Sequence, residues 1–162
     1  IDEAYPPKLH PEDLLIKAIN RSWIEFCNNI SLYTFQLSIK VSEDEFKDTL
    51  ELMLNDFDLV ESCLEDPPFF NGQQFSLVDS SYAPVFQRLD FLEQIYKRII
   101  TQERHPKLAT WKENLLSLKA VKHSAVEDIQ SLYYKLLWTR QGYISQYLSE
   151  EDYGKRPPKS TY

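Results

Sequence analysis

Apolar residues recur along most of this chain at intervals of three and four positions, the spacing that places side chains on one face of an α-helix. The first such stretch follows Pro11 and two acidic residues, a composition typical of a first helical turn. We therefore expect a helix that starts at Pro11 and runs to about Lys40. Its apolar face would consist of Ile16, Ile19, Trp23, Phe26, Cys27 and Ile30.

A second helix is predicted after Ser42, because Ser42 and Glu45 have the spacing of a capping box. Apolar residues follow at helical spacing as far as Leu64. Pro67 and Pro68 then prevent the helix from continuing. Three phenylalanines surround the Asn-Gly pair that comes next, which predicts a short turn fixed by aromatic packing.

The stretch "FSLVDSSYAPVF" predicts the start of a third helix. With Ser76 as the N-cap, Asp79 lies at the third helical position and can accept a hydrogen bond from the Ser76 backbone N–H. The helix is expected to reach about Ile99. Pro84 lies inside it, removes the hydrogen bond to the Ser80 carbonyl and should bend the helix axis.

Two further helices complete the prediction. Pro106 occupies the first helical position of one, whose apolar face contains Leu108, Trp111, Leu115 and Leu118. The other would begin at a capping box formed by Ser124 and Glu127 and would include Ile144. The predicted fold is all-α, an orthogonal or antiparallel bundle of five to six helices. Residues 1–10 would be the end of an interdomain segment, 11–148 the helical domain and 149–162 a mobile tail.

Composition and charge exclude several classes of function. The 162 residues suit one domain, and the formal net charge of −7 argues against nucleic-acid binding, which needs a basic face. No apolar run is long enough to span a membrane, and no signal-peptide pattern is visible. Cys27 and Cys63 lack metal-site spacing and are expected to be buried thiols in a reducing, cytoplasmic compartment.

The sequence contains no self-contained catalytic centre and no metal site. His10, His105 and His123 are not paired with another His or Cys at ligand spacing. There is no GxSxG, no glycine-rich phosphate loop and no HExxH. The aromatic residues of the first and last helices remain, either as core residues or as walls of an apolar pocket.

Three blocks of the chain form a recognisable series. They are "DEAYPPKLHPEDLLIKAINRSWIEF", "FFNGQQFSLVDSSYAPVFQRLDFL" and "HPKLATWKENLLSLKAVKHS". Together they resemble the C-terminal helical domain of bacterial-type cytosolic glutathione transferases. The middle block is the most specific, because a Gly followed by an apolar residue and Ser-x-x-Asp marks the capping box of the buried central helix in this family. The similarity covers nearly the whole chain except its final tail.

The resemblance implies that a full-length protein would contain a thioredoxin-like domain, absent from this chain, that binds glutathione and supplies a catalytic Ser, Cys or Tyr. The helical domain would supply the pocket for a small apolar electrophile and part of a homodimer interface, in a detoxification reaction. The chain begins with sequence typical of the segment between the two domains. We therefore expect it to be part of a longer protein and to be inactive alone.

By the same resemblance, Trp23, Asn29, Tyr33 and Trp138 are the candidate substrate-binding residues, and Ser76 and Asp79 form the structural capping box. Leu32 and Tyr33 replace the His-Lys pair of one bacterial class, so that class is not assigned. The alternative function is a non-enzymatic interaction platform. Helical domains of this type serve that purpose in translation-elongation-factor gamma subunits and aminoacyl-tRNA synthetase complexes.

Overall fold

A computed structural model describes residues 8–66 and 68–153 of the chain. Within these ranges the protein is all-α, as predicted, without a β-strand. The five longer helices correspond to the five predicted ones, and two four-residue helices and a 3-10 helix are added. The elements are α1 (Leu14–Leu37), α2 (Glu43–Cys63), α3 (Leu77–Ile95), α4 (Pro106–Ser117), α5 (Lys119–Lys122), α6 (Ile129–Arg140), η1 (Tyr143–Tyr147) and α7 (Glu150–Tyr153).

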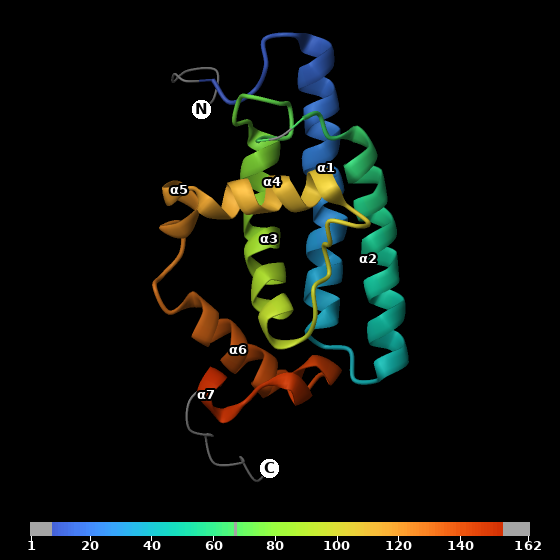
Figure 1. The fold of residues 1–162 in the computed structure, drawn as a ribbon, viewed down its shortest axis with the longest axis vertical. Coiled ribbons are helices and arrows are strands. Elements are labelled where there is room, and N and C mark those ends of the chain that lie inside the picture. Colours follow the sequence, from blue (N-terminus) through green and yellow to red (C-terminus); the bar gives the residue numbers. More distant parts are fainter. Residues whose placement is uncertain (1–7, 67, 154–162) are drawn as a thin grey trace.

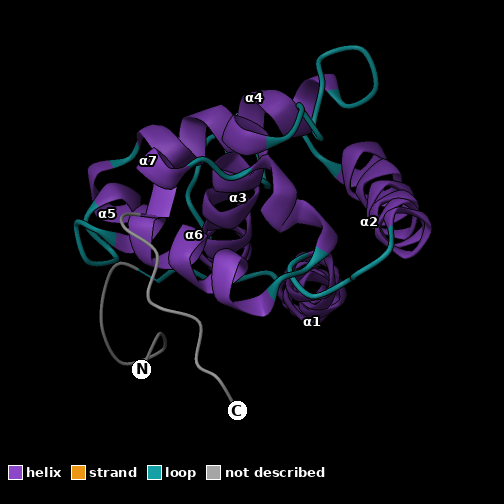
Figure 2. Ribbon diagram, turned by 90° about the horizontal axis from the view of Figure 1, so that it is seen from below, coloured by secondary structure: helices purple, strands orange, loops and turns teal. Residues whose placement is uncertain are grey.

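Helices α1, α2 and α3 run side by side along the long axis of the molecule, as Figure 1 shows. Helix α1 packs against both α2 and α3, and α4 crosses α3 while also contacting α2. Seen from below in Figure 2, α3 lies at the centre of the helical assembly. The segment from α6 to α7 closes one end of the bundle. The five largest fully buried side chains come from α2, α3 and α4 and are Phe46, Phe57, Tyr82, Phe86 and Trp111.

The start of α3 is fixed by the buried carboxyl group of Asp79. Its Oδ2 accepts hydrogen bonds from the backbone N–H and the hydroxyl of Ser76, both at 2.7 Å. Its Oδ1 accepts the Phe70 N–H at 2.8 Å and the Trp111 indole N–H at 2.7 Å. The carboxyl group expected to cap one helix therefore also joins the preceding turn and α4 to that helix.

Helix α1 begins later than predicted. Its N-cap is Asp13, whose Oδ1 accepts hydrogen bonds from the N–H groups of Leu15 and Ile16 at 2.8 and 3.0 Å. The prediction that Pro11 occupies the first helical position is wrong, because the Asp13 side chain satisfies the free N–H groups of the first turn two residues further on. Helix α2 starts after Ser42, as predicted, and Ser42 Oγ accepts the Glu45 N–H at 3.2 Å.

The central helix ends before the predicted Ile99. Glu93, inside the last turns of α3, accepts the N–H groups of Ile99 and Ile100 through Oε1 at 3.0 Å each. These bonds hold the chain in a turn after Ile95 instead of a continued helix. Helix α3 passes through Pro84 without interruption. The bend at Pro84 stays a prediction.

The predicted capping box of Ser124 and Glu127 is wrong. The Ser124 hydroxyl instead donates to the carbonyl of Val121 at 2.7 Å, in the turn after α5. Helix α6 begins only at Ile129, and Ile144 belongs to η1. A local Ser-x-x-Glu pattern does not start a helix here because the hydroxyl already has a partner in the preceding turn.

Helix α6 stops where the chain turns back onto the end of α1. Gln141 has a left-handed backbone with φ 53°, and the N–H of Tyr143 donates to the Lys40 carbonyl at 2.6 Å. Gly142 lies so close to α1 that a Cβ atom there would be 2.9 Å from the Ser38 carbonyl oxygen. The end of α6 and η1 are thereby held against the end of α1.

Both cysteines are free, and they differ in exposure. Cys27 is buried in α1, whereas Cys63 at the end of α2 is exposed. The prediction that Cys63 is buried is therefore wrong, because the last turn of α2 leaves the core. The predicted interdomain segment (1–10) is described only from residue 8, and residues 154–162 of the predicted tail lie outside the described part of the chain, as does Pro67. Residues 150–153 of that tail form α7.

Candidate ligand cavity

A cavity of about 570 Å³ lies between α1, α3 and α6. Its volume is within the range of sites that bind small organic molecules, about 300–1,000 Å³. The lining side chains come from α1 and its C-cap (Ser31, Thr34, Phe35, Ser38), α3 (Val85, Arg88) and α6 (Ile129, Leu132, Tyr133, Leu136, Arg140).

The lining residues of each helix form one wall of the cavity. The lining residues of α1 and of α6 follow one another mostly at intervals of three and four, so each set shares a helix face. On α1, the Thr34 hydroxyl donates a hydrogen bond to the Ile30 carbonyl at 2.9 Å. The hydroxyl is therefore satisfied without a ligand.

Most of the cavity wall is apolar. Val85 of α3 is buried, whereas Leu132 and Leu136 of α6 remain 47% and 42% exposed. Phe35 of α1 is 48% exposed and contributes an aromatic surface. A molecule that covered these side chains would remove apolar surface from water, which is the main favourable contribution to binding in such sites.

Two arginines provide positive charge at this apolar wall. Arg140 donates a hydrogen bond to the Ser38 hydroxyl and its guanidinium lies 4.8 Å from the centre of the Phe35 ring. Arg88 donates to the Pro84 carbonyl at 2.9 Å. Neither forms an ion pair with a carboxylate within residues 8–66 and 68–153. Because a guanidinium carries five N–H donors, each arginine retains donors for a ligand.

Tyr133 adds a polar group to the same cavity. Its hydroxyl is buried and has no hydrogen-bond partner among the described residues. Burial raises the pKa of Tyr133 to about 12, while the nearby charges of Arg88 and Arg140 act to lower the pKa. The phenol therefore stays protonated at physiological pH and keeps a hydrogen to donate.

The candidate residues expected from the sequence lie elsewhere. Trp23 is half-buried and packs against Phe26 and Phe70, with ring centres 5.3 and 5.7 Å apart. Asn29 is exposed, and Tyr33 and Trp138 are half-buried. None of the predicted residues lines the cavity between α1, α3 and α6.

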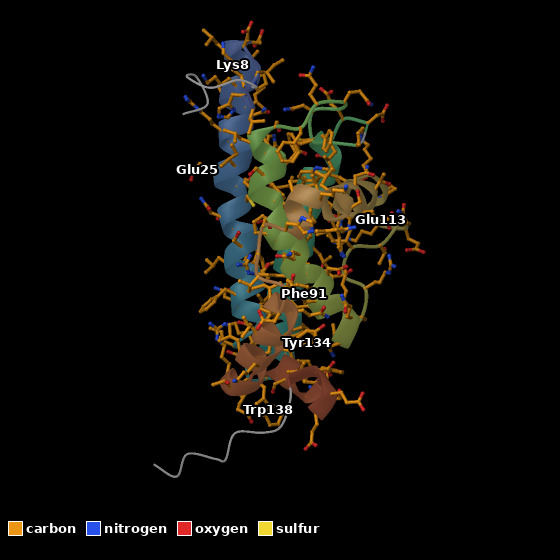
Figure 3. The ribbon with its side chains drawn as sticks, turned by 90° about the vertical axis from the view of Figure 1, so that its left-hand side faces the viewer. Lys8, Glu25, Phe91, Glu113, Tyr134 and Trp138 are labelled. Carbon is orange, nitrogen blue, oxygen red and sulfur yellow. The ribbon has the colours of Figure 1, made fainter. Side chains whose placement is uncertain are left out.

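The structure does not bring all four predicted residues together. In Figure 3, Trp138 lies near the lower end of the molecule, whereas Glu25, two residues after Trp23, lies in the upper half. A role in substrate binding for Trp23, Asn29, Tyr33 and Trp138 stays a prediction.

Sequence reasoning missed both arginines. Arg140 continues the row of α6 residues that includes Leu132, Tyr133 and Leu136, and a charge at the end of an apolar row is a signal that could have been followed. Arg88 lies on α3 three residues after the buried Val85. That α1, α3 and α6 surround one space is visible only in the fold.

The described residues contain no group of three or more His, Cys, Asp or Glu side chains arranged to hold a metal ion. No helix in this part of the chain has the length and hydropathy needed to cross a membrane.

Cys27, near the cavity on α1, donates its thiol hydrogen to the Ser81 carbonyl at 3.4 Å. Burial raises the pKa of this thiol to about 11, which favours the protonated thiol over the reactive thiolate at neutral pH.

Comparison with known proteins identifies related sequences. Residues 43–113, from the start of α2 into α4, match the family model described as "Glutathione S-transferase, C-terminal domain". A "Probable glutathione S-transferase" of Glycine max is 27% identical over 129 residues, covering 72% of this chain and 53% of the relative. "Glutathione S-transferase omega-1" of Rattus norvegicus is 29% identical over 162 residues, covering 95% of this chain and 61% of the relative.

Two solved structures share the fold. Glutathione transferase Omega 3C from Trametes versicolor gives a TM-score of 0.66 at 20% identity, covering 74% of this chain and 53% of the other. The Tau class glutathione S-transferase from mango, Mangifera indica, gives 0.68 at 21% identity, covering 81% and 63%. The chain thus spans between about half and two thirds of the length of the relatives and structures it matches.

Proposed function

We propose that this chain, whose residues 43–113 match the family model of the glutathione S-transferase C-terminal domain, is the helical domain of a glutathione transferase and supplies its pocket for an apolar co-substrate. The observation that carries the proposal is the cavity between α1, α3 and α6, with its partly open apolar wall. In this role the domain binds and orients an electrophile beside a glutathione thiolate.

The proposed reaction is nucleophilic. The glutathione sulfur forms a bond to an electrophilic carbon. In a substitution, the bond from that carbon to its leaving group breaks; in an addition, the electron pair of a double bond to that carbon moves to the atom at its other end, which then takes up a proton. Activation means formation of the thiolate, for which a thioredoxin-like domain of the same protein would supply the binding site and the activating residue. The helical domain contributes by holding the electrophile in a reactive orientation.

The start of α1 supports a place for this helix at a contact between domains or subunits. Leu14 and Leu15 are 81% and 70% exposed, and Ile16 and Ile19 also remain open to solvent. Exposed apolar residues gathered in this way are typical of a surface that another protein part covers. We propose that a thioredoxin-like domain or a second subunit of a cytoplasmic homodimer covers it.

The proposal is tested by filling the cavity. The neutral dye N-phenylnaphthylamine, which fluoresces in apolar surroundings, should bind to the full chain. Leu136→Trp, on the open wall of the cavity, should weaken this binding at least about tenfold, because the indole occupies the space of the dye. The matched control is Leu59→Trp on α2, at a position outside the cavity that is also about half exposed (53%, against 42% for Leu136), which should leave the affinity unchanged.

Equal affinity for both variants would contradict the assignment of the cavity. A second measurement addresses the reaction itself: residues 1–162 alone should not conjugate glutathione to chlorodinitrobenzene, and turnover by this chain would contradict the proposed division of labour. A longer protein that contains both domains and binds the dye but does not conjugate glutathione would favour the alternative function, a non-enzymatic interaction platform.

A further inference from the structure

The cavity carries positive charge without any negative charge in its lining. Arg88 and Arg140 are both lining residues, and no Asp or Glu is among them. The chain as a whole has a formal charge of −7, so a site that presents two cations and no carboxylate differs from the rest of the molecule. An apolar pocket built only for neutral molecules would not need either guanidinium.

Both guanidiniums are held in place before any ligand binds. Arg140 is fixed between the Ser38 hydroxyl and the face of the Phe35 ring, and Arg88 by the carbonyl of Pro84. Side chains that are already oriented lose little rotamer freedom when they bind a ligand. Each of these contacts uses neutral acceptors or an aromatic face, so neither positive charge is neutralised by them.

Tyr133 supplies a third donor between the same helices. Its buried hydroxyl has no partner among the described residues, although buried polar groups in proteins are nearly always hydrogen-bonded. Arg88 of α3 and both Tyr133 and Arg140 of α6 line this one cavity. An acceptor atom of a bound molecule would complete the hydrogen bonding of all three.

We propose that this cavity selects acidic apolar molecules, with a carboxylate or sulfonate head bound by Arg88, Arg140 and Tyr133. The apolar body of the ligand then covers the aromatic and aliphatic wall. Two cationic donors and one neutral donor around a single anion form the charge-assisted hydrogen bonds that carry most of the specificity in such sites. This inference rests on the proposed function, because it names the substrate class of the same cavity.

The test uses two dyes that share an apolar body and differ in charge. Anilinonaphthalenesulfonate carries a sulfonate, and N-phenylnaphthylamine is its neutral counterpart. Both are titrated into the full chain and followed by fluorescence. We expect the anionic dye to bind more tightly at low salt and to lose affinity when the ionic strength is raised from about 0.02 to about 0.3 M, while the neutral dye is insensitive.

Charge-removing variants locate the effect. Arg88→Gln and Arg140→Gln should each weaken binding of the anionic dye about tenfold and change binding of the neutral dye less than about twofold. Tyr133→Phe should weaken binding of the anionic dye about threefold. Arg140→Lys should retain more affinity than Arg140→Gln. The matched control is Arg21→Gln, which removes the same charge from an exposed position of α1 outside the cavity.

The outcomes separate this inference from the function on which it rests. If the neutral dye binds and the anionic dye responds equally to Arg21→Gln and to the two cavity variants, the acid selectivity is wrong and the apolar pocket stands. If neither dye binds to the wild-type chain, both proposals are wrong. Retained binding of the neutral dye shows that a variant is folded. If Arg140→Gln does not fold, Arg88→Gln alone tests the acid selectivity.

Discussion

At the scale of single residues, the structure depends most on Asp79. This fully buried side chain accepts four hydrogen bonds, from two groups of Ser76, from Phe70 and from Trp111. Its partners belong to the turn before α3, to the start of α3 and to α4. One carboxyl group therefore satisfies donors from the turn before α3, from the start of α3 and from Trp111, which lies 32 residues further along the chain.

Asp79→Ala is expected to destabilise the fold by about 3–5 kcal/mol, because each buried donor left without a partner costs about 1–3 kcal/mol. Ser76→Ala should cost less, about 0.5–2 kcal/mol, since it removes only one partner of the cap. The free energy of unfolding is measured by urea denaturation, with the exposed Asp48→Ala as control. A loss for Asp79→Ala no larger than that for Ser76→Ala would show that the contact to α4 contributes little.

At the scale of elements, helix α4 receives its cap from another helix. Its own N-cap residue, His105, makes no side-chain capping bond. Glu61 of α2 instead accepts the N–H of Lys107 through Oε1 at 3.0 Å and that of Leu108 through Oε2 at 2.7 Å. A negative side chain at a helix start also interacts favourably with the helix dipole. Secondary structure and tertiary packing are coupled at this point.

Glu61→Ala should therefore lower the free energy of unfolding by about 0.5–2 kcal/mol, as the loss of a helix cap does. The control is Glu127→Ala, the residue of the capping box that the structure does not contain, which should change stability by less than about 0.5 kcal/mol. Both values come from chemical denaturation at neutral pH. Equal effects of the two substitutions would contradict the assignment of Glu61 as the cap of α4.

At the scale of the whole molecule, charged contacts join α2 to the segment before α4. Both oxygens of Asp58 pair with the guanidinium of Arg104, at 3.0 and 2.8 Å, and Oδ1 lies 2.8 Å from Nε2 of the buried His105. Lys112 of α4 is in turn paired with Glu93 of α3. Helix α4 is thus held to both of its neighbours by charge as well as by apolar packing.

Asp58 gives the stability a defined pH dependence. The hydrogen bonds from Arg104, and then that from His105, hold the pKa of Asp58 below its ordinary value of about 3.9. Because the folded state binds this proton less readily than the unfolded state, the stabilisation is present above about pH 4 and is lost as the pH falls through the folded pKa. The contribution is modest, since the Asp58 side chain is 46% exposed.

We expect thermal stability measured between about pH 5 and pH 2 to fall less steeply in Asp58→Asn than in the wild type. Asp48→Asn, at an exposed position on the same helix, should follow the wild-type curve. Parallel curves for the wild type and Asp58→Asn would show that the pair with Arg104 does not contribute to acid sensitivity.

Local sequence patterns were sufficient to predict the five longer helices and the Ser76–Asp79 cap at the start of α3. Apolar residues at intervals of three and four, Ser76 with Asp79, and Pro106 are local signals, because the bonds they report form within one or two turns of chain. Local signals were wrong where a neighbouring group supplied the same bond better. Asp13 replaced Pro11 as the start of α1, and Ser124 bonded backward to Val121.

The tertiary structure alone decided which residues meet. The cavity combines Arg88 of α3 with Arg140 of α6 and Phe35 of α1, although nothing in their local patterns links the three. Glu61 caps a helix to which it does not belong, and Asp79 serves donors from two other segments. Such contacts depend on how helices cross and pack, which is set by the summed burial of the whole core. The periodicity of apolar residues along a helix determines which of its faces is buried. Only the packing of the whole fold determines which other helix that face contacts.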